Sequence, residues 1–220
     1  MTTAIAQDLR QQLLEELDWE PKLGTSQVDV RISDRGIVTL TGLAKSYAEK
    51  VAAERAARRV RGVHAVVNDI DILLPMTHER SDPAIAEAVV RALEWDVLVP
   101  HDVIDVRLSD GWVRLSGTVD WDYQRTAAVD AVQFLTGVKG ITNRIAVRPR
   151  VMVPDIKARI EAALRRNADV EAHGITVQLE DSTVTLRGRV QSLAERAAAE
   201  AAAWAAPSVT AVKNELELQP

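Results

Sequence analysis

The stretch Val38-Thr39-Leu40-Thr41-Gly42 ends a run of alternating apolar and polar residues, and Asn68 follows its glycine after 26 residues. The same glycine and asparagine recur, at the same separation, as Gly117 with Asn143 and as Gly188 with Asn214. Matching alanines lie between them in all three copies: Ala52, Ala127 and Ala198; Ala53, Ala128 and Ala199; Ala56, Ala131 and Ala202. Self-similarity at a fixed period is typical of tandem repeats. The chain is therefore predicted to hold three copies of one unit, at residues 1–75, 82–149 and 154–220.

Each copy contains two helical patterns and three alternating patterns. In the first copy Leu9, Leu13 and Leu17 recur every four residues, which places them on one helix face. Alternation over 28–32, 37–41 and 67–73 is typical of strands with one buried face. Ser46 and Glu49 have the spacing of a capping box, so a second helix begins there, between the last two strands. The corresponding strands are expected at 104–108, 112–116 and 142–147, and at 175–179, 183–187 and 213–218.

These patterns predict an α+β fold made of three tandem α-β-β-α-β domains. The first two strands are joined by short turns such as Ser109-Asp110-Gly111, which is hairpin chemistry. The last two strands are joined through a helix and should run parallel. Each domain is therefore expected to be a three-stranded mixed sheet with two helices on one face.

Two motifs in each copy resemble the BON domain, a family named for bacterial osmotically inducible and nodulation proteins. They are V-x-L-x-G, which ends at each repeat glycine, and G-V-x-x-V-x-N, which ends at each repeat asparagine. The second motif runs over 62–68 and, with Ile for Val, over 137–143. Ser208 replaces its first glycine in the third copy, so a different turn is expected there. The resemblance implies the same α-β-β-α-β fold, no catalytic motif, and attachment to phospholipid membranes in osmotic or envelope stress.

Composition excludes several classes of function. The chain has no cysteine and a net charge of −5, and none of its three units is basic. Disulfides and thiolate metal sites are therefore excluded, and a nucleic-acid partner, which needs a cationic surface, is not expected. No apolar run approaches the length of a membrane span. The amino terminus lacks the pattern of a secretory signal, which predicts a cytoplasmic protein, or a periplasmic one if a native leader is missing from the sequence.

No residue pattern indicates an enzyme, a metal site or a cofactor. The chain has no nucleophile motif and no glycine-rich phosphate loop. Its histidines stand singly along the chain and lack the spacing of paired metal ligands. They are His64, His78, His101 and His173.

Candidate contact residues are concentrated in the second copy. Aromatic rings beside arginines are typical of membrane interfaces and of anchors for protein partners, and burial against a neighbouring repeat is the alternative. The candidates are Trp112, Arg114, Trp121, Tyr123 and Arg125. Trp19 and Trp95 follow the first helix of their copies, where we expect them to pack against the end of that helix.

A second basic group and the repeat residues complete the candidate set. The basic group is either a solvated helix face or a contact for anions and lipid headgroups, and it comprises Arg55, Arg58, Arg59 and Arg61. The repeat glycines Gly42, Gly117 and Gly188 are interpreted as supplying a backbone conformation or close approach that a side chain would block. Asn68, Asn143 and Asn214 are expected to satisfy backbone groups where the last strand begins.

Two functional hypotheses follow from these residues. The first is a non-enzymatic protein that associates peripherally with phospholipid membranes through the second copy. The second is a cytoplasmic protein-interaction or stress-protective module that uses grooves or strand edges. A site for a small ligand or a cation, made from backbone carbonyls, is a third possibility.

Overall fold

The computed structural model describes residues 2–24, 27–33, 35–149, 155–167, 170 and 174–219, with side chains from residue 7 onward. The first repeat contains α1 (Thr2–Asp18), β1 (Gln27–Ile32), β2 (Ile37–Ala44), α2 (Tyr47–Arg59) and β3 (Ala65–Ile72). The second contains α3 (Asp82–Trp95), the short 3-10 helix η1 (His101–Val103), β4 (Ile104–Ser109), β5 (Trp112–Val119), α4 (Asp122–Val132) and β6 (Gly140–Val147). The third contains α5 (Ile156–Arg166), β7 (Thr176–Glu180), β8 (Thr183–Val190), α6 (Leu193–Trp204) and β9 (Ala211–Leu218).

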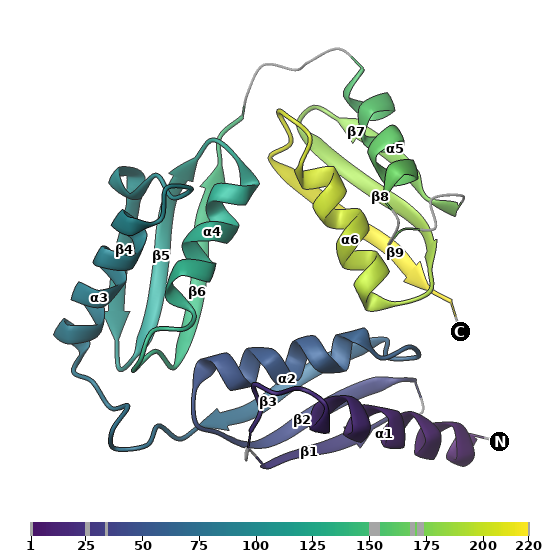
Figure 1. Cartoon of the computed structure of the whole chain (residues 1–220). Coiled ribbons are helices and arrows are strands. Elements are labelled where there is room, and N and C mark those ends of the chain that lie inside the picture. Colours follow the sequence, from purple (N-terminus) through teal and green to yellow (C-terminus); the bar gives the residue numbers. More distant parts are fainter. Residues whose placement is uncertain are drawn as a thin grey trace. The chain divides into compact units, whose positions relative to one another are not determined.

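Each repeat folds around its own three-stranded sheet, with its two helices on one face (Figure 1). The strand orders are β1-β2-β3, β4-β5-β6 and β7-β8-β9. The hairpin pairs β1–β2, β4–β5 and β7–β8 are antiparallel, whereas β2–β3 and β5–β6 are parallel. The predicted α+β class and α-β-β-α-β order are therefore confirmed.

The alternating patterns bury one face of each sheet. Val38 and Leu40 of β2 are fully buried beneath the helices, and so is Leu13 of α1. The repeat alanines Ala53 and Ala56 are also fully buried on the inner face of α2. Their small side chains let the helix approach the sheet closely. Because both helices lie on this face, the opposite face of the sheet is free of helices (Figure 1).

The repeat glycines are required by the backbone, as the sequence predicted. Gly42, Gly117 and Gly188 have φ angles of +129°, +144° and +139°, which side chains of L residues rarely adopt. An added Cβ would also lie only 2.0–2.1 Å from a carbonyl oxygen on the neighbouring segment, in each of the three repeats. These glycines therefore serve the fold.

The last strand of each repeat begins earlier than predicted, which places the repeat asparagines inside the strand. β3 starts at Ala65, so Asn68 lies within the strand instead of opening it. Its amide nitrogen donates to the backbone oxygen of Lys50, at 2.9 Å, and to the carboxylate of Glu54, at 3.3 Å. Its side-chain oxygen also accepts from the backbone nitrogen of Ile70 at 3.4 Å. Asn68 therefore satisfies backbone groups, as expected, and in addition connects the strand to helix α2. Asn214 makes the matching bonds to Arg196 and Glu200 on α6.

The expected change of turn at Ser208 is also wrong. Ser208 has a φ of +72°, close to the values of +87° at Gly62 and +94° at Gly137. The third repeat therefore keeps the left-handed backbone of the other two, with a serine in place of glycine.

Candidate functional site

Trp19 and Trp95 are exposed, contrary to the expectation that they pack at the ends of their helices. Their exposed fractions are 84% and 87%. The i, i+4 spacing fills the inner face of each helix with aliphatic residues, so the ring at its end points outward. A large exposed ring is uncommon enough to indicate a contact site when other apolar residues lie beside it.

The loop after Trp95 supplies such residues. Asp96 accepts a hydrogen bond from the backbone nitrogen of Leu98 at 2.9 Å, which shapes a tight turn. Val99 returns to the core with only 5% of its surface exposed. Val97 and Leu98 at the tip are left 96% and 51% exposed. Two aliphatic side chains therefore project into solvent from a loop that is held at both ends.

The equivalent loop of the first repeat has the same backbone bonds and a polar tip. The backbone nitrogen of Leu23, which is buried, donates to the carbonyl of Glu20, as Val99 does to Asp96. Pro21 and Lys22 stand where the second repeat has Val97 and Leu98. The sequence analysis missed these two aliphatic residues. Comparing the loops of the repeats is the signal that finds them.

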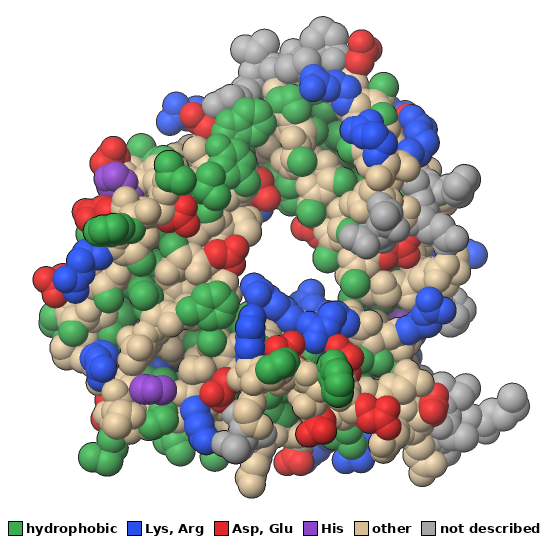
Figure 2. All heavy atoms as spheres, in the orientation of Figure 1, with side chains coloured by type: hydrophobic (Ala, Val, Ile, Leu, Met, Phe, Trp, Pro, Cys, Tyr) green, Lys and Arg blue, Asp and Glu red, His purple; other side chains and the backbone are tan. Residues whose placement is uncertain are grey.

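The connector between β5 and α4 lies at the same end of the sheet as this loop. Ile104, the first residue of β4, pairs with Gly117 near the end of β5, and Val103 just before it is 45% exposed. Beyond the end of β5, Trp121 and Tyr123 stack with ring centroids 6.4 Å apart, and Tyr123 is 53% exposed. Figure 2 shows hydrophobic side chains gathered at this end of the second repeat, where β6 ends, with acidic side chains beside them. We call the set formed by Trp95, Val97, Leu98, Val103, Trp121 and Tyr123 the apolar rim.

Charges beside the apolar rim are largely paired. Asp120 lies 3.9 Å from Arg148. Asp102 lies 3.1 Å from His101, a contact that is an ion pair only when the imidazole is protonated. Asp122 forms an ion pair with Arg125, which lies three residues further along α4. Burial raises the pKa of the Asp122 carboxyl, and Arg125 opposes that shift. The rim therefore presents no excess of positive charge.

The five candidate residues of the second repeat fall into two groups, so they do not form the single contact surface that the sequence suggested. Trp121, Tyr123 and Arg125 follow the end of β5. Trp112 and Arg114 lie at its start, and seven residues of strand separate Trp112 from Val119, which is roughly 23 Å at about 3.3 Å per residue. The two groups therefore lie at opposite ends of β5.

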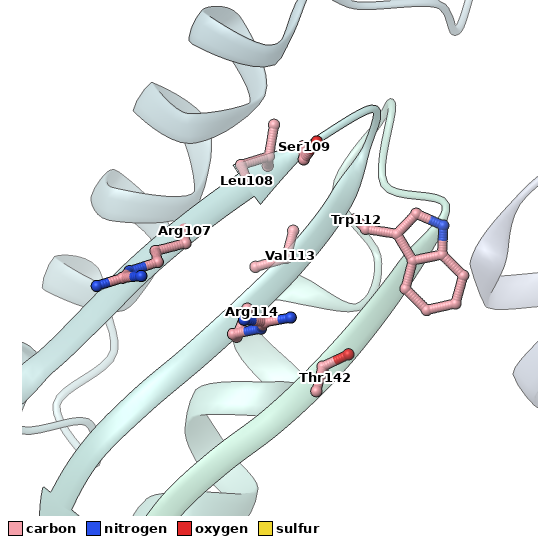
Figure 3. A pocket seen from close by; sticks show the side chains of 7 residues that line it. All are labelled: Arg107, Leu108, Ser109, Trp112, Val113, Arg114 and Thr142. Carbon is pink, nitrogen blue, oxygen red and sulfur yellow. The ribbon is translucent and has the colours of Figure 1, made fainter.

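Trp112 and Arg114 belong instead to the helix-free face of the β4-β5-β6 sheet. They border a shallow pocket of about 390 Å³ with Arg107 and Thr142 from the neighbouring strands (Figure 3). Arg107 and Thr142 were not among the predicted site residues. The strand register could have identified them, because Arg114 stands opposite Arg107 on one side and Thr142 on the other.

The basic group of the first repeat largely holds its own domain together. Arg58 pairs with Glu54 at 2.7 Å, and Arg59 lies 2.8 Å from Glu16 and 3.0 Å from Glu20. The hydrogen bond from Arg59 lowers the pKa of the Glu20 carboxyl. These contacts favour the structural interpretation of Arg58 and Arg59. Arg55 and Arg61 are exposed.

No group of three or more potential metal ligands is found among the side chains that the structure describes. His64 and His78 lie in different loops of that region, His101 begins the short helix η1, and His173 falls outside the described residues. Helices long and apolar enough to cross a membrane are likewise not found among the described residues.

The chain is similar to proteins of known name. It is 29% identical over 120 residues to Osmotically-inducible protein Y of Escherichia coli (strain K12), across 53% of this chain and 60% of that protein. The shared region thus spans less than two thirds of that relative. Two structures of CdsD, a structural protein of the type III secretion system of Chlamydia trachomatis, align with 94% and 97% of this chain and 98% and 93% of theirs. Their sequence identities are 13% and 15%, each with a TM-score of 0.27.

A family model gives the firmest assignment. The model of the BON domain matches residues 6–73, 81–149 and 153–220, which together cover nearly the whole chain and coincide with the three folded repeats. The chain belongs to the BON-domain family and carries three tandem copies of the domain.

Proposed function

We propose that this protein is a non-enzymatic binding protein that associates peripherally with phospholipid membranes through the apolar rim of its second repeat. The observation that supports this function most is the loop tip of Val97 and Leu98, next to the exposed ring of Trp95. Apolar side chains held away from the core by a fixed turn are suited to entering the boundary between headgroups and acyl chains. Tryptophan and tyrosine are enriched at that boundary, because their rings are apolar and carry one polar group.

The energy available at the rim is consistent with reversible attachment. Burying one Val or Leu side chain completely contributes about 1.5–3 kcal/mol. A few partly buried side chains, after the cost of association, give weak and reversible binding of one domain. Osmotic stress changes the membrane, and the similarity to Osmotically-inducible protein Y supports a role under that condition.

The charges at the rim predict which membranes are bound. Arg148 and Arg125 are paired with Asp120 and Asp122 of the same domain, so these arginines leave no net attraction for anionic headgroups. We therefore expect binding to zwitterionic vesicles, with little gain from anionic lipid and little loss in salt. Attraction between exposed charges would instead be screened as salt rises.

A protein partner is the competing function. Exposed aromatic and aliphatic side chains with paired charges around them also fit the centre and edge of a protein interface. A cytoplasmic location would favour such a partner. That location stays a prediction, to be checked by cell fractionation of the native protein.

Vesicle flotation distinguishes the two functions. The full chain should float with phosphatidylcholine vesicles, and the double variant Val97→Pro/Leu98→Lys, which copies the tip of the first repeat, should not. Trp19→Ala is the matched control, because Trp19 is as exposed as Trp95 but lacks the aliphatic tip. Failure of the wild type to float with any lipid composition would reject the membrane function and leave the protein partner.

A further inference from the structure

We infer that the helix-free sheet face of the second repeat binds a small molecule that carries a phosphate group and a flat apolar group. The site comprises Arg107, Arg114, Thr142 and Trp112. It lies at the opposite end of β5 from the apolar rim, so it is independent of membrane attachment through that rim.

Two arginines without acidic partners stand side by side on this face. Arg107 on β4 and Arg114 on β5 are directly opposite in the antiparallel register, so both side chains leave the same face of the sheet. Both are exposed, and neither has an ion pair or a side-chain hydrogen bond to any described residue. Like charges directly opposite each other destabilise a sheet. An anion bound between them would remove that repulsion.

The neighbours of this pair favour a tetrahedral oxyanion. Thr142 stands opposite Arg114 on β6 and adds a hydroxyl donor. The next row of the same face holds Asp105 and Arg144 on either side of Ser116, so the basic charges outnumber the acidic one. One arginine fork already satisfies a planar carboxylate, whereas two forks and a hydroxyl match the larger number of acceptors on a phosphate.

Trp112 provides an apolar platform beside the arginines. A Cβ built on Gly140 would lie 2.5 Å from the Cζ3 atom of Trp112, so the indole rests directly on the glycine backbone. The side chain is nevertheless 53% exposed, which leaves a ring surface open. Figure 3 shows the indole over β6, Arg114 on the side of Thr142, and the Arg107 guanidinium extended away from β5. A flat group stacked on the indole would place an attached phosphate near Arg114, and Arg107 would swing toward it.

The size of the pocket and its restriction to one repeat support a ligand. A volume of about 390 Å³ lies within the range of small-molecule sites, which is about 300–1,000 Å³. In the first repeat the corresponding row is Arg31, Thr39 and Val67, so only one of the two arginines is present. Ile37 stands where the second repeat has Trp112. The BON fold therefore does not require this combination.

The test uses the full chain and three probes: phenyl phosphate, inorganic phosphate and phenol. Binding is followed by the indole N–H signal of Trp112 in NMR spectra, which the Trp112→Phe variant assigns. We expect phenyl phosphate to bind more tightly than inorganic phosphate, and phenol to bind least. Arg107→Gln/Arg114→Gln should weaken phenyl phosphate binding at least about tenfold, because hydrogen bonds to charged groups are lost. Arg31→Gln, which removes the lone arginine of the first repeat, should leave it unchanged.

Further variants and vesicles distinguish a free phosphate compound from a lipid headgroup. Trp112→Ala, in which binding is followed by calorimetry because the indole reporter is gone, should weaken phenyl phosphate binding and spare that of inorganic phosphate. The rim variant Val97→Pro/Leu98→Lys tests for a lipid source, because it lacks attachment through the rim. If this variant still binds phosphatidylglycerol vesicles, loses that binding when Arg107 and Arg114 are also replaced, and gives no signal with phenyl phosphate, then the phosphate comes from a lipid headgroup. The rim variant Val97→Pro/Leu98→Lys should bind phenyl phosphate normally, so loss of membrane attachment leaves this site intact. The assignment would be overturned if phosphate probes do not bind the wild type and phosphatidylglycerol vesicles do not bind the rim variant. Equal binding by the arginine double variant, with an unchanged melting temperature, would also overturn it.

Discussion

The side-chain amide of Asn68 reaches from strand β3 to the carboxylate of Glu54 on helix α2, with 3.3 Å between the nitrogen and the oxygen. Asn214 and Glu200 repeat the contact at 2.9 Å in the third domain. In the second domain Val129 stands where the others have glutamate. Asn143 keeps the local bond that all three asparagines accept, here from the backbone nitrogen of Ile145 at 3.0 Å. One repeat residue therefore has different contacts in different copies.

Asn68→Ala should lower the stability of the first domain by roughly 1–3 kcal/mol, because a bond to a charged group and a bond to a helix carbonyl are both lost. Asn143→Ala should have a smaller effect on the second domain. Hydrogen exchange of the amides in α2 and α4, measured on the full chain with urea, reports the two domains separately. Equal losses at both positions would show that the helix contact contributes nothing.

Gly117→Ala should destabilise the second domain by at least about 1–3 kcal/mol, because a strained φ and a blocked approach act together. The added Cβ would lie 2.1 Å from the carbonyl oxygen of Val103. Gly174→Ala is the control, since its Cβ would meet no atom closer than 3.7 Å and its φ is not positive. Thermal unfolding should separate the two variants, and equal melting temperatures would contradict this account of the repeat glycine.

The contact of Arg59 with Glu20 should make the first domain sensitive to acid. Because the pKa of Glu20 is lowered in the folded state, the unfolded chain binds more protons in the acid range. This contribution is therefore fully present at neutral pH and is lost as the pH falls through the folded pKa. The loss of stability in Arg59→Gln should be largest near pH 7 and shrink below about pH 4.3, the ordinary pKa of glutamate.

Urea unfolding at several pH values measures this difference for the first domain. Arg58→Gln is the matched control, because it removes a neighbouring arginine whose partner Glu54 lies on the same helix. A loss of stability in Arg59→Gln that is constant from pH 7 to acid would contradict the linkage.

Replacing the tip of the second repeat by that of the first should leave the fold intact. In Val97→Pro/Leu98→Lys both changed side chains are exposed, and the first repeat shows that Pro21 and Lys22 fit the same turn. The melting temperature should therefore match that of the wild type. A large drop would mean that the aliphatic tip stabilises the domain, and its exposure would then say little about binding.

The fold was predictable because its rules are local and are repeated three times. Alternation identifies the strands, and the glycine two residues before the end of β2, β5 and β8 follows from its backbone conformation. The starts of the last strands were missed because small residues such as Ala65 and Gly140 carry no apolar signal, although they pair fully with β2 and β5.

The candidate site was only partly predictable. The sequence indicated the second repeat and its aromatic residues, but residues close in sequence, such as Trp112 and Trp121, lie at opposite ends of one strand. The direction of a ring at the end of a helix also depends on which face the aliphatic residues fill. In α3 they fill the inner face, so the ring of Trp95 points into solvent. Register, which no single segment specifies, brought Arg107 beside Arg114.

Fluorescence of single-tryptophan chains tests the central claim most directly. One chain keeps only Trp95 and the other only Trp19, with the remaining tryptophans replaced by phenylalanine, and both are mixed with vesicles of brominated phosphatidylcholine, which quenches rings that enter the bilayer. The account predicts that the emission of Trp95 shifts to shorter wavelength and is quenched, whereas that of Trp19, which is equally exposed in the free protein, stays unchanged. Unchanged emission from Trp95, or equal quenching of both rings, would contradict attachment through the apolar rim.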